Sequence, residues 1–249
     1  MTGKLQDKVA LVTGASSGIG EATALALAAE GAHVAVAARR VDRLDALVKK
    51  IQQHGGKALP IAADVADEAQ VNAMVKRTHS EFRRLDILVN NAGVMLLGPI
   101  EDANTEGWRQ MVNVNVLGLM YATRAALPIM QKQGSGHIVN ISSVAGRTAQ
   151  AGSGGYNVTK WGVVAFSEAL RQEVYRQNIR VTTIEPGAVA TELAEHITDD
   201  AAKKALAEWL QSITPLESED IAAAVLYAVT QPARVDVNEI LIRPTNQER

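Results

Sequence analysis

The sequence predicts an α/β protein with one domain, built on a doubly wound parallel sheet of about seven strands with helices on both faces. Short apolar runs rich in β-branched residues alternate along the chain with longer, helix-like stretches. The connections between them are short, which favours right-handed crossovers and parallel strands. The chain has 249 residues, 47% of them hydrophobic, and shows no internal repeat or low-complexity linker. This is enough for one large core.

The composition excludes several classes of function. There is no cysteine, which excludes disulfides, thiolate metal sites and cysteine nucleophiles. The five histidines are scattered without metal-ligand spacing, so we expect no metal. The formal net charge is −2 and basic residues never run beyond two in a row, which disfavours nucleic acid and anionic membranes as partners. No apolar signal segment or bilayer-spanning run is found, so we expect a cytoplasmic protein.

A glycine-rich loop follows the first expected strand, residues 8–13. It reads Thr-Gly-Ala-Ser-Ser-Gly-Ile-Gly at residues 13–20 and leads into an alanine-rich helix that ends near Glu30. Glycines let the backbone turn sharply and approach a ligand, and the helix N-terminus then faces a phosphate. The spacing differs from the dinucleotide fingerprint G-x-G-x-x-G, and a tight strand–helix turn is the alternative. The position after the first strand favours dinucleotide binding.

The second expected strand, residues 33–38, ends at Arg39 and Arg40, before a helix over 41–54. In dinucleotide-binding folds an acid near the end of this strand binds the ribose 2′-hydroxyl, whereas arginine accommodates a 2′-phosphate. No acid is present here, and the alternative is that the arginines only solvate a loop. Paired arginines suit bidentate phosphate contacts, which favours NADP(H). We expect Arg39 to be the main partner, because it directly follows the usual position of the acid.

Two further strands end in candidate ligand-binding residues. A strand over 57–63 ends at Asp64 and Val65. After a helix over 67–83, a strand over 86–90 ends in Asn-Asn-Ala-Gly at residues 90–93. Open α/β sheets bind ligands at the carboxyl ends of their strands. An ordinary turn at 90–93 is an equally good interpretation.

The next helix is expected to be capped by Thr105 and to be kinked or ended by Pro128. Asn113 and Asn115 lie inside its apolar stretch, where asparagine is locally unfavourable. Such residues either bond nearby backbone or have a function.

The most informative stretch joins a fifth strand, which ends with Ser142 and Ser143, to a helix that carries Tyr156 and runs to about residue 177. Tyr156 and Lys160 are four residues apart, so they share one helix face, about 6 Å apart along the axis. A lysine ammonium beside a phenol favours the phenolate and lowers the tyrosine pKa from about 10 by roughly 1–3 pKa units. Such a tyrosine exchanges protons near neutral pH, and a nearby serine hydroxyl holds a substrate oxygen. A core tyrosine with a satisfied hydroxyl is the alternative.

Apolar positions of this helix are expected to face the core. They are Val158, Trp161, Val164, Ala165 and Leu170.

The last part of the chain is expected to contain a strand at 179–185 followed by Pro186 and Gly187, then a helix at 219–229 and a strand at 239–243. Residues 188–216 are polar and alanine-rich, with no buried strand, and are interpreted as a substrate lid. The residues expected to line a partly apolar substrate site are Met95, Leu96, Leu97, Ala145, Ala151 and the 188–216 segment.

The order of these motifs resembles the short-chain dehydrogenase/reductase family over essentially the whole chain. The matching residues are the loop at 13–20, Asp64 and Val65, residues 90–93, Asn115, Ser143, Tyr156 with Lys160, and Pro186 with Gly187. The family places its catalytic serine 13 residues before its tyrosine, which selects Ser143 rather than Ser142. The resemblance implies a Rossmann-like fold and a homo-oligomer, either a tetramer or a dimer.

The resemblance also implies a role for each site residue. Tyr156 would be the general acid/base, and Lys160 would lower its pKa and hold the nicotinamide ribose. Ser143 would orient the substrate oxygen, and Asn115 would hold a water molecule. The residues implied to bind NADP(H) are Gly14, Ser16, Ser17, Ile19, Arg39, Arg40, Asp64, Val65, Asn91, Ala92, Gly93, Tyr156, Lys160, Pro186, Gly187, Val189 and Thr191.

Two segments depart from the common family pattern. Many NADP-dependent members carry a basic residue where this chain has Ser17. Many relatives also end the last strand with Val-Asp-Gly-Gly, whereas this chain reads VNEILIRPTNQER. This tail looks more like clavulanic acid dehydrogenase and the serine-dehydrogenase-like reductases.

The resemblance and the residue chemistry together predict an NADP(H)-dependent oxidoreductase that transfers a hydride between the nicotinamide and a small carbonyl or alcohol substrate. One alternative is a non-catalytic, nucleotide-sensing regulator on the same fold, which the intact set of Ser143, Tyr156 and Lys160 disfavours. An epimerase or dehydratase is a further alternative, but it needs a longer substrate domain than residues 188–216 supply.

Overall fold

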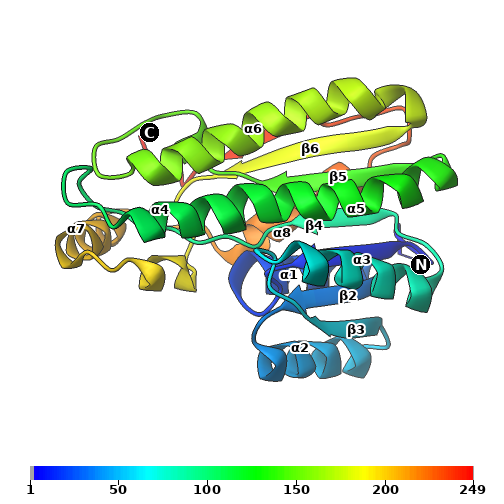
Figure 1. Cartoon of the computed structure of the whole chain (residues 1–249). Coiled ribbons are helices and arrows are strands. Elements are labelled where there is room, and N and C mark those ends of the chain that lie inside the picture. The colour runs from blue at the N-terminus through cyan, green and yellow to red at the C-terminus, as the bar shows by residue number, and fades with distance from the viewer. Residues whose placement is uncertain (1–2, 249) are drawn as a thin grey trace.

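The computed structural model describes residues 3–248, and one seven-stranded sheet runs through them (Figure 1). The strand order is β3-β2-β1-β4-β5-β6-β7, and all neighbours are parallel. The strands are β1 (Val9–Thr13), β2 (His33–Ala38), β3 (Lys57–Ala62), β4 (Ile87–Asn90), β5 (Gly136–Ile141), β6 (Ile179–Pro186) and β7 (Glu239–Ile242). The doubly wound parallel sheet predicted from the sequence is confirmed.

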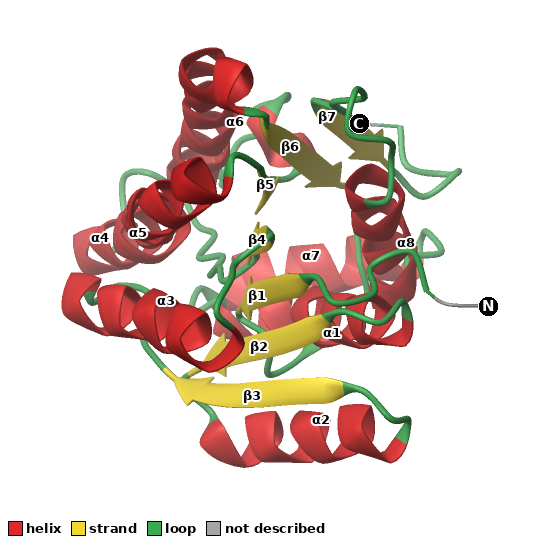
Figure 2. Ribbon diagram, turned by 90° about the vertical axis from the view of Figure 1, so that its right-hand side faces the viewer, coloured by secondary structure: helices red, strands yellow, loops and turns green. Residues whose placement is uncertain are grey.

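Helices cover both faces of the sheet (Figure 2). The main helices are α1 (Gly18–Ala29), α2 (Val41–Gln53), α3 (Glu68–Phe82), α4 (Thr105–Met111), α5 (Gly118–Gln133), α6 (Gly154–Val174), α7 (Asp200–Gln211) and α8 (Ser218–Val229). Side chains of α1, α2 and α8 form a core on one face, and those of α3, α5 and α6 form a core on the other. Within residues 3–248, no helix has the length and apolar character needed to cross a membrane.

Strand β1 shows why these runs become central strands. All five of its residues are buried. Ala10 and Val12 pack into the core beside α1, while Val9 and Leu11 pack into the core beside α3. A strand covered on both faces needs apolar residues at every position, which explains the continuous apolar run.

The strand order reverses between β1 and β4, because β2 lies on one side of β1 and β4 on the other. Loops that leave the two strands diverge there and leave a crevice at the carboxyl ends. The loop after β1 is tight: Gly14 has a φ of +65°, and a Cβ at this position would lie 2.7 Å from the Ala92 Cα. Only glycine fits this close approach to the segment after β4.

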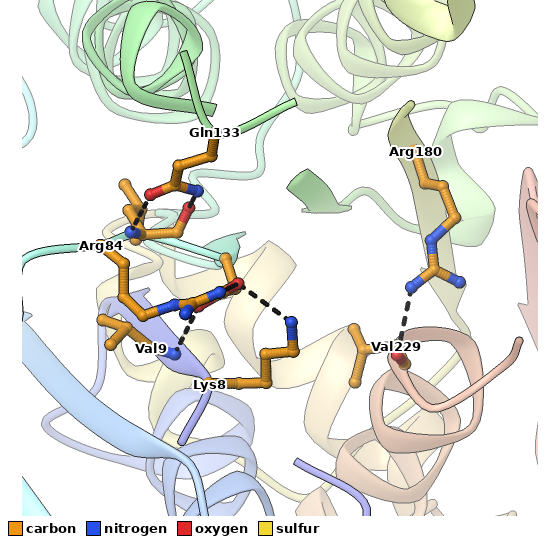
Figure 3. A network of polar contacts seen from close by, with 8 residues as sticks. Lys8, Val9, Arg84, Gln133, Arg180 and Val229 are labelled. Atoms are coloured by element: carbon orange, nitrogen blue, oxygen red, sulfur yellow. Dashed lines mark hydrogen bonds and ion pairs between the residues drawn. The ribbon is translucent and has the colours of Figure 1, made fainter. Parts of the chain in front are cut away.

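Asp86 joins β1 and β4 at their amino ends, which lie at the edge of the sheet opposite the crevice. Its carboxylate accepts hydrogen bonds from the Val9 N–H at 2.9 Å and from the Arg84 Nε and Nη2, both at 2.6 Å, and it lies 3.3 Å from the Lys8 Nζ. Figure 3 shows Lys8, Val9 and Arg84 close together in this network of polar contacts. Burial alone raises the pKa of Asp86, but these contacts outweigh burial and lower it overall. The two strands that border the crevice are therefore anchored at their far ends.

Of the two outcomes expected at Pro128, a kink or an end of the helix, the end is not found. Helix α5 continues through Pro128 to Gln133. Ala122 and Ala126 before the proline and Met130 after it are all buried in the same core. This packing holds the helical path although the proline lacks an N–H donor.

Two boundaries also differ from the expectation. Asn104, rather than Thr105, caps α4, because its side chain accepts a hydrogen bond from the N–H two residues on. Strand β5 ends at Ile141, so Ser142 and Ser143 lie just beyond the strand. Both differences are shifts of one or two residues at element ends, where hydrogen-bonding detail decides the boundary.

The apolar positions expected to face the core from α6 are partly wrong. Val158 and Trp161 are 68% and 48% exposed. The buried face instead includes Tyr156, Lys160 and Val163. Because 3.6 residues make one turn, a helix that turns Tyr156 and Lys160 inward presents Val158 and Trp161 to the outside.

Candidate active site

A cleft of about 590 Å³ lies at the carboxyl ends of the strands, where the strand order reverses. Its size is typical of small-molecule sites. All of the predicted site residues line it except Asn115: they are Gly14, Ser16, Ser17, Ile19, Arg39, Arg40, Asp64, Val65, Asn91, Ala92, Gly93, Ser143, Tyr156, Lys160, Pro186, Gly187, Val189 and Thr191. Among residues 3–248 no group of three or more side chains is placed to hold a metal ion.

Helix α6 brings Tyr156 and Lys160 to the cleft on one face, as the four-residue spacing predicts. Each residue is only 6% exposed. The Lys160 Nζ lies 5.7 Å from the centroid of the Tyr156 ring and donates a hydrogen bond to the Ile141 carbonyl at 2.9 Å. The end of β5 therefore fixes the position of the ammonium beside the tyrosine.

The expected lowering of the Tyr156 pKa is not found. Burial raises the pKa of Tyr156 to about 12, although a hydrogen bond with Ser143 acts in the opposite direction. Burial also lowers the pKa of Lys160 to about 8. Both shifts have the same cause, because an enclosed site disfavours the charged form of each group. The Lys160 ammonium also donates its hydrogen bond to the Ile141 carbonyl rather than to the phenol. In the protein alone, Tyr156 therefore keeps its proton at neutral pH.

The two serines after β5 have different surroundings. The Ser142 hydroxyl is buried and donates to the Lys160 carbonyl at 2.9 Å, which joins the end of β5 to α6. The Ser143 hydroxyl accepts a hydrogen bond from the Ala145 N–H at 3.1 Å and donates to the Pro186 carbonyl at 3.4 Å. It is also close enough to the Tyr156 phenol to act on the pKa of that group as a hydrogen-bond partner. Of the two serines, only Ser143 therefore has its hydroxyl beside the phenol.

Asn115 lies behind the cleft, in a π-helical segment between α4 and α5 (Val112–Leu117). Its side chain accepts a hydrogen bond from the Val94 N–H at 2.8 Å and donates to the Val94 carbonyl at 2.9 Å and the Thr159 Oγ1 at 3.1 Å. These contacts fix the segment after β4 against α6. Short π-helical segments are frequent at functional sites, and the two asparagines in an apolar stretch were the sequence signal for this one.

At the other end of the cleft, Arg40 lies over the glycine loop. Its guanidinium donates to the Ser16 Oγ at 2.9 and 3.1 Å and to the Ser17 Oγ at 2.7 Å. The Arg39 side chain is 61% exposed and forms a 4.0 Å ion pair with Asp64. Arg40, rather than Arg39, is therefore the arginine that contacts the serines of the glycine loop. Their sequence positions could not show which side chain turns toward the loop.

Thr13 and Asn91 brace the glycine loop. The Thr13 hydroxyl accepts hydrogen bonds from the N–H groups of Asn91 and Ala92, at 3.1 and 3.2 Å. The Asn91 side chain donates to the carbonyls of Thr13 and Gly14, at 3.0 and 3.2 Å. Residues 90–93 are therefore more than an ordinary turn, since they hold the loop after β1 in place.

The segment over 188–216 forms the remaining wall. It contains a 3₁₀ helix (Glu192–His196) and α7, which lies beyond the end of the sheet in Figure 1. Val189 and Leu216 pair in an isolated parallel bridge, which joins the two ends of the segment. The segment contributes no strand to the main sheet, as expected.

The chemistry of these residues fits a phosphorylated dinucleotide. Ser17 makes no side-chain cap hydrogen bond at the start of α1, so the N–H groups of the first turn are not used by a cap. Such N–H groups bind phosphate. Hydroxyls of Ser16 and Ser17 and the Arg40 guanidinium lie beside them.

Two charged residues were missed by the sequence analysis. The Glu192 carboxylate accepts a hydrogen bond from the Arg40 Nη1 at 2.7 Å and from the Arg43 Nη1 at 2.6 Å. Arg43 follows Arg40 by three residues on α2, and helix spacing was an available signal for it. Glu192 is 152 residues from Arg40, and no local signal points to this contact.

Comparisons with known proteins agree with this geometry. A family model described as short chain dehydrogenase matches residues 8–202. An oxidoreductase of Staphylococcus saprophyticus is 42% identical over 246 residues, which are 98% of each chain. Serine dehydrogenase in its closed form with NADP+ has a TM-score of 0.90 and 36% identity, over 97% of this chain and 96% of that chain.

A second solved structure, an alcohol dehydrogenase of Thermococcus sibiricus with 5-hydroxy-NADP, has a TM-score of 0.87 and 30% identity, over 97% of this chain and 98% of that chain. The sequence matches and the fold extend over nearly the full length of the chain. This chain therefore belongs to the short-chain dehydrogenase/reductase family and is an oxidoreductase.

Proposed function

We propose that the protein transfers a hydride between NADP(H) and a small carbonyl or alcohol substrate, with Tyr156 as the general acid/base. One observation carries this proposal: a single cleft is lined by Tyr156, Ser143 and Lys160 at one end and by Arg40 and the glycine loop at the other. A proton donor at one end and phosphate-binding groups at the other suit a dinucleotide whose redox ring lies beside the substrate.

Carbonyl reduction needs a proton at the oxygen, where negative charge develops. The raised pKa of Tyr156, about 12, keeps the phenol protonated at neutral pH and ready to donate. The Ser143 hydroxyl is hydrogen-bonded to Tyr156 and positions the same substrate oxygen. When bound, NADPH supplies the hydride. In alcohol oxidation the proton moves in the opposite direction.

Lys160 has two roles in this proposal. Because the pKa of Lys160 is about 8, most of its amine is in the ammonium form at pH 7. Its positive charge stabilises the Tyr156 oxygen after the proton has been donated, and its N–H groups hold the nicotinamide ribose. Asn115 donates a hydrogen bond to Thr159, which precedes Lys160 on α6, and so supports Tyr156 and Lys160. By the family resemblance, Asn115 also holds a water molecule that connects Lys160 to solvent.

We assign the 2′-phosphate of the cofactor to Arg40 rather than Arg39. Arg40 already contacts the two serines of the glycine loop, whereas Arg39 extends toward solvent and Asp64. A guanidinium held beside two hydroxyls forms a set of donors for phosphate oxygens. The two solved relatives described above were determined with NADP+ and with 5-hydroxy-NADP, which supports NADP(H) as the cofactor.

The substrate end of the cleft is largely apolar. Its walls include Met95, Leu97 and Ala145, as predicted, together with Leu206 and Trp209 from α7. Leu96 and Ala151 are not among the lining residues. Leu96 instead packs in the cluster around Met111. We therefore propose a small, partly apolar carbonyl or alcohol as substrate, which a screen of NADPH oxidation against aldehydes and ketones would identify.

The first prediction concerns Tyr156. Tyr156→Phe removes the transferable proton and keeps the ring, so kcat should fall by about 100-fold or more. The Kd of NADPH should change little, because the ring stays in place and the contacts proposed for the glycine loop and Arg40 are kept. Tyr227→Phe removes the same atom from an exposed position on α8 and should leave kcat unchanged. A Tyr156→Phe enzyme with wild-type turnover contradicts the assignment.

The second prediction concerns the arginines. A hydrogen bond to a charged group contributes about 1.5–3 kcal/mol, or about 10- to 150-fold in affinity. Arg40→Ala should therefore lower kcat/KM for NADPH by at least about 10-fold and leave that for NADH nearly unchanged. Arg39→Ala is the matched control and should have a smaller effect. A wild-type ratio of kcat/KM for NADPH over NADH near or below one would overturn the cofactor assignment.

The third prediction concerns residues 188–216, which we propose act as a lid. The segment is outside the main sheet and is held at its base by the Val189–Leu216 bridge. Its backbone should gain protection from hydrogen exchange when NADP is bound, because the cofactor fills the cleft beneath it. Helix α3 lies away from the cleft and serves as the internal control. Equal protection of 188–216 in both states means that the segment is not a lid.

The fourth prediction concerns assembly. Trp108, Val112, Val158 and Trp161 are 37%, 38%, 68% and 48% exposed on helical segments that lie side by side in Figure 1. We propose that this surface binds a second copy of the chain, because large exposed apolar patches mark interfaces. Trp161→Glu should then lower the mass measured by light scattering, whereas Val41→Glu on α2 should not. A wild-type protein that is monomeric at high concentration contradicts the proposal.

A further inference from the structure

Glu192 links the start of the lid to the cofactor end of the cleft. It is the first residue of the 3₁₀ helix (Glu192–His196). Its two carboxylate oxygens are divided between two arginines: Oε2 lies 2.7 Å from the Arg40 Nη1 and Oε1 lies 2.6 Å from the Arg43 Nη1. A single anion thus bridges both guanidiniums.

The bridge uses the group that we assign to the 2′-phosphate. The remaining Arg40 nitrogens, Nε and Nη2, are occupied by the Ser16 and Ser17 hydroxyls. The Nη1 that would remain for an incoming anion already contacts Glu192. Hydrogen bonds from Arg40 and Arg43 hold the pKa of Glu192 at about 2, so the carboxylate is ionised at any physiological pH.

A carboxylate across two guanidiniums presents the same chemistry as a phosphate: several anionic oxygens, each accepting a charge-assisted hydrogen bond. A 2′-phosphate brings about two further negative charges to the same guanidiniums. Two anions in contact repel each other and compete for the same N–H donors. The carboxylate and the phosphate therefore cannot both bind Arg40 with full affinity. Either the carboxylate leaves or the phosphate binds weakly.

Stability alone does not explain the bridge. The side chains of Glu192, Arg40 and Arg43 are 36%, 42% and 43% exposed. Ion pairs at such exposed positions contribute little to folding. Glu192 lines the cofactor end of the cleft, so its charge affects cofactor binding more than it affects folding.

We propose that Glu192 occupies the position of the cofactor 2′-phosphate and competes with it for Arg40 and Arg43, which makes Glu192 a residue that determines the strength of NADP(H) preference. This inference rests on the proposed use of NADP(H). Binding of the phosphorylated cofactor separates the Glu192 carboxylate from the two guanidiniums. A cofactor without the 2′-phosphate has no group that replaces the carboxylate.

The test compares 2′,5′-ADP with 5′-AMP as probes, because the two differ only in the 2′-phosphate. Their Kd values are measured by calorimetry on wild type, Glu192→Gln and Glu195→Gln. Glu192→Gln keeps the shape of the side chain and removes its charge. It should tighten 2′,5′-ADP by about 10-fold and change 5′-AMP by less than about two-fold. Glu195→Gln removes a charge from the same short helix and should change neither.

A double-mutant cycle identifies the arginine that is involved. On an Arg40→Ala background, Glu192→Gln should no longer improve binding of 2′,5′-ADP, because the contested group is gone. Unchanged or weaker 2′,5′-ADP binding in Glu192→Gln, or equal tightening of both probes, overturns the proposal. Failure of the NADP(H) assignment is seen separately, as a wild-type protein that binds 2′,5′-ADP no better than 5′-AMP.

Discussion

The adjacency of β1 and β4 is the constraint on which the rest of the structure depends. In a parallel sheet the carboxyl ends of all strands lie at one edge, so residues that are far apart in sequence meet there. Asp86 ties the amino ends of β1 and β4, and the Thr13–Asn91 contacts tie their carboxyl ends. Both borders of the crevice are thus fixed at both ends. The geometry of the cleft is a property of the sheet, and the glycine loop is braced against it rather than left to its own flexibility.

Burial at α6 affects both the geometry and the pKa values of Tyr156 and Lys160. The same enclosure that holds Tyr156 and Lys160 in one geometry favours the uncharged form of each, and moves their pKa values to about 12 and about 8. A phenolate–ammonium pair requires a tyrosine pKa below the lysine pKa. Burial shifts the two pKa values in the opposite directions. In the protein alone, Tyr156 is therefore a neutral phenol, and the proposed proton donation starts from this form. Positive charge close to the phenol is what a phenolate needs, and Lys160 is the residue that can supply it.

Features encoded locally were predictable, and features set by side-chain direction or distant contacts were not. The strands, the glycine loop and the pairing of Tyr156 with Lys160 follow from runs and spacings of a few residues. The exposure of Trp161 depends on which face α6 turns inward, and several apolar stripes are compatible with its sequence. Arg39 and Arg40 are the same residue type at adjacent positions, and only the structure shows that the Arg40 side chain turns to the loop. The Tyr156 pKa follows from burial, which the spacing of two residues does not report.

The segment over 188–216 connects the two ends of the cleft through one backbone. Thr191 lies against Gly18, where an added Cβ would be 3.1 Å from the threonine methyl, and Glu192 follows directly. Trp209, on α7 of the same segment, lines the apolar end. The Val189–Leu216 bridge restrains only the base of the segment. We therefore expect a displacement at Glu192 to move the short 3₁₀ helix and α7 rather than the sheet. The carboxylate held by Arg40 and the apolar wall formed by Trp209 are thus carried by one segment of backbone, which connects the two functions that we propose for the cleft.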